Sequence, residues 1–76
     1  MKKFTVLLLY PDYLASNYGE ETYLAHMTAK SVPRAIVAAQ REAFDENKLE
    51  PDDGEPIDFA PLMVIEGHHD DIRGRA

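Results

Sequence analysis

The 76-residue sequence contains no cysteine and no tryptophan, and it has only eight lysine or arginine residues against fourteen aspartate or glutamate residues. The absence of cysteine excludes disulfides and thiolate metal ligands, and it favours a reducing, cytoplasmic location. The formal net charge of −6 argues against a nucleic-acid partner, because affinity for the phosphate backbone comes from lysine and arginine. No apolar run approaches the roughly 20 residues of a membrane span, so we expect no membrane partner.

Two near-continuous apolar runs dominate what is present. Residues 4–10 and 59–65 are typical of strands that are buried on both faces, and the second run belongs to a strand over about residues 58–66. A more polar, alternating segment over residues 21–29 predicts another strand, suited to an edge of the sheet. Ser31 as N-cap, followed by Pro33, then predicts a helix that runs to about Asp45.

The predicted helix carries an apolar stripe that can pack on a sheet. At about 100° per residue, five side chains fall within one stripe: Val32, Ala35, Ile36, Ala39 and Ala43. Val37 and Phe44 lie together on a flank, roughly 100° away from that stripe, so we expect both to be incompletely covered.

The order strand, strand, helix, strand predicts a single α+β domain over residues 1–76, with a three-stranded antiparallel sheet and the helix on one face. A right-handed return from the helix places the third strand beside the first, which gives the strand order 2-1-3. This order puts the most apolar strand in the centre. It also puts Pro61 on an edge strand, where its missing N–H group is tolerated.

A single helix covers only one face of such a sheet. We expect six side chains to meet the helix: Val6, Leu8, Tyr23, Ala25, Met63 and Ile65. The open face then carries five large aliphatic side chains: Leu7, Leu9, Leu24, Leu62 and Val64. A large exposed apolar patch marks an interaction site, so we predict a homodimer through the open faces. The alternatives are that the acidic loop or the C-terminal tail covers this face, or that a different protein binds it.

Half of all the acidic residues lie in one short segment. Residues 45–58 contain seven carboxylates, and Lys48 is their only cation. Such a charge run usually serves as a solvated loop. Alternatively the segment attracts a basic protein partner, with Asp52, Asp53 and Glu55 leading the contact.

His68, His69 and Asp70 form the one local cluster with the side chains of a metal site, and His26 could approach it from the second strand. Adjacent residues of an extended chain point in opposite directions, so we expect solvated histidines and no bound metal or cofactor. The sequence has no cysteine nucleophile and no glycine-rich phosphate loop, and we therefore predict no catalytic residues. A small metal-dependent enzyme that uses this histidine cluster is an alternative.

Residues 5–13, 21–26 and 64–71 resemble stretches of small uncharacterised bacterial and mobile-element proteins, a resemblance that implies no activity. The hairpin followed by residues 31–36 is also similar in topology to the partial ribonuclease-H-like domain of HicB-type antitoxins. The Pro-Gly-Cys-like turn and the DNA-binding extension of that family are missing. The sequence thus predicts a non-enzymatic, acidic protein-binding module. We expect either an inhibitor of a basic nucleic-acid-binding complex, similar to phage-borne anti-CRISPR proteins, or a HicB-like antitoxin.

Overall fold

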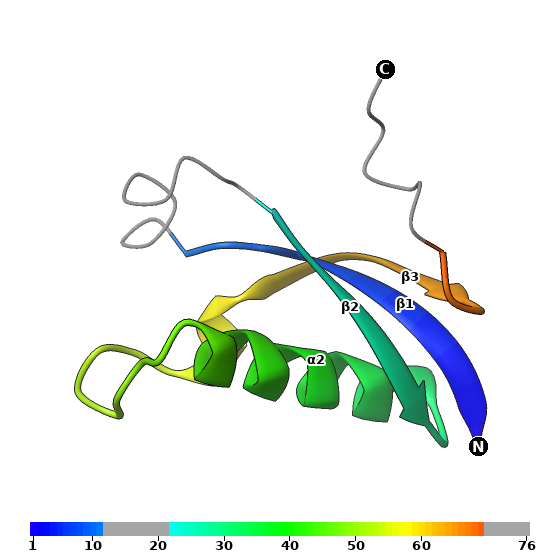
Figure 1. Cartoon of the computed structure of the whole chain (residues 1–76), viewed down its shortest axis with the longest axis horizontal. Coiled ribbons are helices and arrows are strands. Elements are labelled where there is room, and N and C mark those ends of the chain that lie inside the picture. Colours follow the sequence, from blue (N-terminus) through cyan, green and yellow to red (C-terminus); the bar gives the residue numbers. More distant parts are fainter. Residues whose placement is uncertain (12–21, 70–76) are drawn as a thin grey trace.

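The structure is a computed structural model, and it describes residues 1–11 and 22–69 (Figure 1). The elements follow in the order β1 (Lys2–Leu9), β2 (Thr22–Ala29), α2 (Val32–Glu46), a short 3₁₀ helix η1 (Pro56–Asp58) and β3 (Ala60–Glu66). The predicted α+β architecture is confirmed, because the three strands form one antiparallel sheet in the order β2-β1-β3 and α2 packs on it. Within the described ranges, no helix has the length and apolar character needed to cross a membrane.

β1 occupies the centre of the sheet because its side chains are apolar on both faces. Phe4, Val6 and Leu8 belong to the buried core that the sheet forms with the alanines of α2. Thr5 and Leu7, which alternate with them and therefore point to the opposite face, are buried as well. A strand that is buried on both faces and paired on both edges is the framework on which the rest of the chain is placed.

β3 presents its side chains to the faces opposite to those predicted. Val64 lies across from Val6 and packs against the core, so it belongs to the helix face and its predicted place on the open face is wrong. Met63 lies across from Leu7, and Ile65 likewise falls on the open face. Directly paired residues of an antiparallel ladder share a face, so the pairing register decides the matter.

An irregularity in the β1–β3 pairing accompanies this change of face. Leu7 pairs with Met63, whereas the next residue, Leu8, pairs with Pro61, which leaves Leu62 as an extra residue on β3. Such a bulge bends the strand and changes the direction of the side chains beyond it. Pro61 does lie on an edge strand, as the strand order predicts.

The N-terminus of α2 follows the predicted capping pattern. Ser31 has an extended backbone, and its hydroxyl oxygen accepts a hydrogen bond from the Arg34 amide at 3.4 Å. Pro33 occupies the first turn, where its missing N–H group removes no helical hydrogen bond. The sequence therefore predicts the start of this helix correctly.

The buried face of α2 differs in part from the predicted stripe. The three alanines are buried as expected, but Val32 is exposed and Gln40 is buried. Phe44, predicted on an uncovered flank, is only 5% exposed, because the chain after the helix folds back and η1 packs against α2. Val37, on the same flank, is 64% exposed as predicted. The helix face toward the sheet is thus made of Ala35, Ala39, Gln40, Ala43 and Phe44.

Gln40 links the helix to the beginning of β3. Its Nε2 donates a hydrogen bond of 2.9 Å to the carbonyl of Phe59, whose side chain is fully buried. The Phe59 ring packs edge-on against Tyr10 at a centroid distance of 5.7 Å, and Tyr10 packs in the same way against Tyr23 at 6.3 Å. One buried polar side chain and three aromatic rings therefore fix where β3 enters the sheet.

The C-terminus of α2 closes with two paired hydrogen bonds. The Lys48 amide donates to the Asp45 carbonyl at 3.0 Å, and the Leu49 amide donates to the Phe44 carbonyl at 3.3 Å. This is the Schellman arrangement, which usually places a glycine in the left-handed conformation at the residue after the cap. Here Lys48 takes that conformation, with a φ of 57°.

Candidate interaction surface

The open face of the sheet is less exposed at its centre than the sequence predicts. Leu7, which was expected to contribute to a dimer interface, is only 8% exposed, and Thr5 beside it is fully buried. Leu24, the partner of Leu7 on β2, is half-buried, while Leu9 at the end of β1 remains exposed. The centre of the open face is therefore covered, and its exposed apolar side chains, Leu9 and Met63, lie toward one end of β1 and on β3.

A turn after β3 covers one end of this face. Gly67 has a φ of +95°, which glycine adopts readily, and its amide donates to the Lys3 carbonyl at 2.6 Å. The Thr5 hydroxyl donates to the Gly67 carbonyl at 2.7 Å and accepts from the His69 amide at 2.8 Å. The beginning of the tail, one of the predicted covers, therefore reaches this face beside Thr5.

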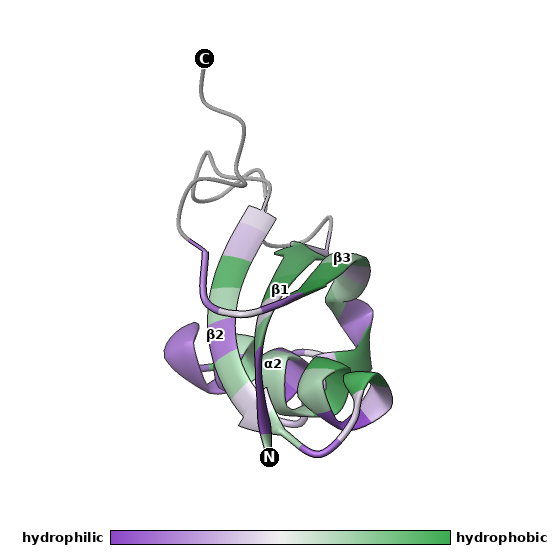
Figure 2. Ribbon diagram, turned by 90° about the vertical axis from the view of Figure 1, so that its right-hand side faces the viewer, coloured by the Kyte–Doolittle hydropathy of each residue, from purple (hydrophilic) through white to green (hydrophobic). Residues whose placement is uncertain are grey.

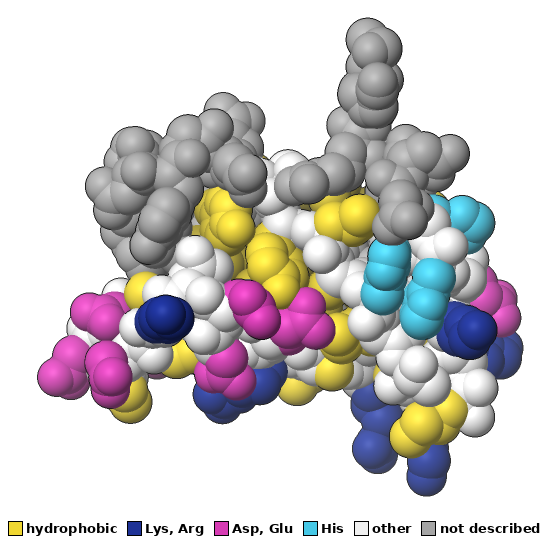
Figure 3. Space-filling view, in the orientation of Figure 1, with side chains coloured by type: hydrophobic (Ala, Val, Ile, Leu, Met, Phe, Trp, Pro, Cys, Tyr) yellow, Lys and Arg dark blue, Asp and Glu magenta, His cyan; other side chains and the backbone are white. Residues whose placement is uncertain are grey.

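The three histidines meet at this end of the sheet (Figure 3). The rings of His26 and His68 stack with their centroids 4.9 Å apart, so His26 does approach the cluster as the sequence allows. Nε2 of each histidine lies near a backbone carbonyl: His26 near His69 at 3.0 Å, His68 near Met27 at 3.2 Å, and His69 near Glu66 at 3.0 Å. A carbonyl only accepts, so these nitrogens act as donors.

The described part of the histidine cluster does not bring three metal ligands together. A ring nitrogen that donates to a carbonyl carries a hydrogen, so Nε2 of each histidine is not a ligand in that state, while Nδ1 keeps a free lone pair. Asp70, the carboxylate of the predicted metal alternative, lies outside the described residues. Among the residues that are described, no three histidine, aspartate or glutamate side chains come together closely enough to hold an ion.

Exposed large apolar side chains also gather along β3 and next to η1. On β3, Leu62 is 52% exposed and Met63 is 44% exposed. Ile57 of η1 is 70% exposed and lines an open groove with Val37 of α2. We call these four side chains, together with the outer edge of β3, the β3 surface.

The backbone adds to the binding capacity of the β3 surface. β3 pairs with β1 on one side only, and no other described strand pairs with its outer edge (Figure 2). Edge strands are usually protected by charges, prolines or bulges, and β3 carries Pro61, the bulge at Leu62 and Glu66, while its residues 62–65 are all apolar. The opposite edge strand, β2, is more polar and includes Thr22, His26 and Thr28. The edge formed by β3 is therefore more apolar than the edge formed by β2.

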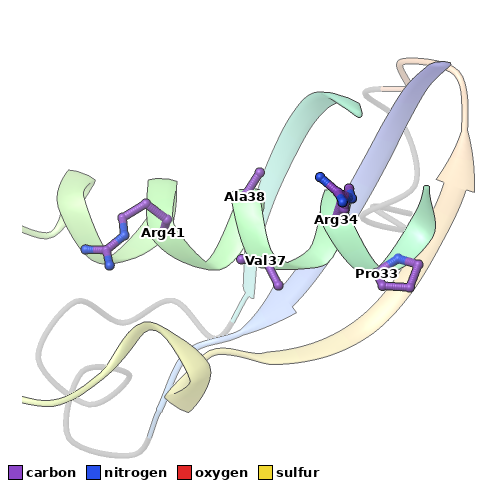
Figure 4. A pocket seen from close by; sticks show the side chains of 5 residues that line it. All are labelled: Pro33, Arg34, Val37, Ala38 and Arg41. Atoms are coloured by element: carbon purple, nitrogen blue, oxygen red, sulfur yellow. The ribbon is translucent and has the colours of Figure 1, made fainter. Parts of the chain in front are cut away.

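The outward face of α2 forms only a shallow hollow (Figure 4). Its lining comes from this one helix, and Val37 and Ala38 point to opposite sides of the helix in the close-up. Arg34 and Arg41 lie toward its two ends. A hollow that one helix lines cannot enclose a small substrate, since such sites are concave and bury most of their ligand.

The acidic segment is exposed along its whole length. Every carboxylate-bearing residue from Asp45 to Asp58 is exposed to solvent. Two of them shape turns: Asp53 Oδ2 accepts from the Glu50 amide at 2.9 Å, and Asp58 Oδ2 accepts from the Glu55 amide at 3.0 Å. Of the three predicted contact residues, Asp53 thus has a structural task, whereas the hydrogen bonds described for this segment give none to the Asp52 side chain.

Tyr23 joins β2 to α2 on the side of the helix away from β3. Its hydroxyl donates a short hydrogen bond of 2.6 Å to Glu42 Oε2. Partial burial, together with this hydrogen bond and the negative charge of Glu42, raises the pKa of Tyr23 above its ordinary value. Tyr23 therefore stays protonated in the folded protein at pH values where a free tyrosine ionises.

Comparisons of the chain with protein-family models, with curated protein sequences and with solved structures found no match. The resemblances to mobile-element proteins and to HicB-type antitoxins therefore stay predictions.

Proposed function

We propose that the chain is a non-enzymatic protein-binding module that takes up an extended segment of a partner along the outer edge of β3. The observation that carries this proposal is the exposed, apolar β3 strand at the edge of the sheet, with Leu62 and Met63 both about half exposed. Pro61 and Glu66 stand toward the two ends of this strand, and the residues between them, 62–65, are all apolar. An apolar stretch on a sheet edge favours a partner strand as the occupant.

Addition of a strand would use both the backbone and the side chains of the β3 surface. Main-chain hydrogen bonds to the edge would supply affinity, and contacts with alternate side chains would supply specificity. Met63 lies on the open face, while the groove of Val37 and Ile57 lies between α2 and η1. An incoming strand would therefore meet apolar side chains beside its backbone.

The acidic segment favours a partner with basic residues next to the bound strand. Glu55 and Asp58 are exposed and immediately precede β3, so positive side chains at that end of the bound segment would be attracted. Asp52 would contribute to the same field from the preceding turn. These features support the predicted role as an inhibitor of a basic nucleic-acid-binding complex, and the lack of cysteine is compatible with a cytoplasmic setting.

Selection from a library of displayed random peptides tests the proposal directly. The chain is coupled sparsely to a surface, and the bound peptides are compared for the unmodified chain, Met63→Lys and Thr28→Lys. Both substituted positions are exposed, but Thr28 lies on the opposite edge strand. We expect extended apolar peptides with flanking lysine or arginine to bind the unmodified chain and Thr28→Lys, and to lose binding to Met63→Lys. Failure to enrich any peptide, or equal binding by all three proteins, would refute the proposal.

A further inference from the structure

We propose that the occupant of the β3 edge is a second copy of this chain. The two β3 strands pair antiparallel about a twofold axis and join two three-stranded sheets into one continuous sheet of six strands. This inference rests on the proposed function, since it identifies the partner that binds the same edge. It differs from a dimer through the open faces, because it joins the two β3 edges through main-chain hydrogen bonds and leaves Leu24 and the buried Leu7 outside the contact.

The distribution of charge along β3 favours this antiparallel arrangement. The N-terminal end of the strand follows Glu55 and Asp58, both exposed. At its C-terminal end the neighbouring strand contributes two exposed lysines, Lys2 and Lys3, and Lys2 lies 3.9 Å from Glu66. An antiparallel pair therefore sets the acidic end of each copy against the lysine-bearing end of the other. A parallel pair would set like charges together.

The whole-molecule charge leads to the same orientation. Each copy carries a net charge of −6, so a stable dimer has to keep its acidic segments apart. The acidic side chains gather toward one end of the molecule, and the histidines lie toward the other (Figure 3). Antiparallel addition at β3 places the two acidic segments at opposite ends of the joined sheet.

The β3 sequence is itself suited to pairing with a copy of itself. Leu62, Met63, Val64 and Ile65 are apolar, and the single charged residue, Glu66, stands at the end of the strand. In an antiparallel ladder the two Glu66 residues would be separated by most of the strand length, about 20 Å at roughly 3.4 Å per residue. Met63 is the middle residue of Ala60–Glu66, so the two copies of Met63 would lie close to the twofold axis.

The absence of cysteine allows a clean test, because a single introduced thiol is the only one in the chain. Under mild oxidation we expect Met63→Cys to form a disulfide-linked dimer, since paired positions near a twofold axis come within disulfide range. The matched variants Thr28→Cys, on the other edge, and Leu24→Cys, on the open face, are expected to cross-link no more than they do in denaturant. Preferential cross-linking through Leu24→Cys would overturn the inference in favour of the open-face dimer.

Sedimentation across the micromolar range supplies the second measurement. We expect the unmodified chain and Thr28→Lys to be dimers. Met63→Lys should raise the dissociation constant by roughly 100-fold, because it sets like charges opposite each other in the ladder. A folded monomer for the unmodified chain throughout this range would overturn the inference. If Met63→Lys does not fold, the cysteine variants decide the question.

The two proposals can fail separately. A monomeric chain that still selects peptides at β3 removes the second copy as partner and leaves the binding module. A monomeric chain that selects no peptide removes both proposals.

Discussion

Thr5 and His69, 64 positions apart in the chain, share a hydrogen bond of 2.8 Å from the His69 amide to the Thr5 hydroxyl. The same hydroxyl donates to the Gly67 carbonyl at 2.7 Å, and the Thr5 side chain is fully buried. A single polar group on the central strand therefore holds the turn that follows the last strand. The link depends on a hydroxyl, which both donates and accepts.

Thr5→Val tests this link, because it keeps the shape of the side chain and removes the hydroxyl. It leaves the Gly67 carbonyl and the His69 amide without this partner, and we expect a loss of about 1–3 kcal/mol in the free energy of unfolding. Thr5→Ser keeps both hydrogen bonds and should lose less. Urea denaturation measures the difference, and equal stability of the valine and serine variants would contradict the assigned role.

Lys48 offers a substitution that should stabilise the protein. Its left-handed backbone strains any residue with a Cβ atom, and glycine removes that strain at the cost of a more flexible unfolded chain. We expect Lys48→Gly to raise the free energy of unfolding by about 0.5–1 kcal/mol, measured by thermal or urea denaturation. Lys48→Ala loses the same charge but keeps the Cβ atom, so it should gain nothing. If the alanine variant gained as much as the glycine variant, charge would be the cause and not the backbone.

The packing of α2 on the sheet predicts different outcomes for two adjacent alanines. Ala39 is fully buried against the sheet, whereas Ala38 is exposed. Ala39→Leu should overpack the interface and cost about 1–3 kcal/mol in the free energy of unfolding. Ala38→Leu should be nearly neutral. Similar urea midpoints for the two variants would show that this helix does not pack as described.

The raised pKa of Tyr23 predicts a loss of stability in alkaline solution. Above about pH 10 the unfolded chain loses the Tyr23 proton while the folded protein keeps it. The folded state then binds more protons, so the free energy of unfolding falls as the pH rises. Below pH 10 the Tyr23–Glu42 hydrogen bond makes its full contribution to the free energy of unfolding.

Tyr23→Phe isolates this effect from that of the other groups that titrate in alkali. We expect the variant to be less stable than the unmodified chain near neutral pH, and the gap between them to narrow as the pH rises above 10. Urea denaturation of both proteins from pH 8 to pH 11 measures the gap. A gap that stays constant over this range would mean that Tyr23 ionises equally in the folded and unfolded states.

The strand order could be predicted from the sequence because it follows from local chemistry. The run from Phe4 to Leu9 needs cover on both faces and pairing on both edges, and Pro61 belongs on an edge strand. Ser31 and Pro33 fix the start of the helix in the same local way. Each of these features depends on a few neighbouring residues, so the sequence contains enough information.

The orientation of β3 could not be predicted in this way. Positions 62–65 are all apolar, so no alternation marks one face, and the face is set by pairing with β1 and by the extra residue at Leu62. The burial of Phe44 and Gln40 likewise depends on a segment that returns from further along the chain. As a result, Leu9 and Leu62 of the predicted surface are exposed, whereas Leu7 is buried and Val64 turns to the helix face.

The central strand also determines what happens while the protein is being made. β1 is synthesised before both of its neighbours, and one of them, β3, follows β2 and α2 along the chain. Until β3 is available, Phe4–Leu9 has one edge unpaired, and its side chains are almost all apolar. An apolar strand with an unpaired edge is prone to aggregation. Pairing with β3 thus protects β1 from aggregation within the same chain. β3 covers the edge of the longer strand β1 and leaves its own shorter edge exposed.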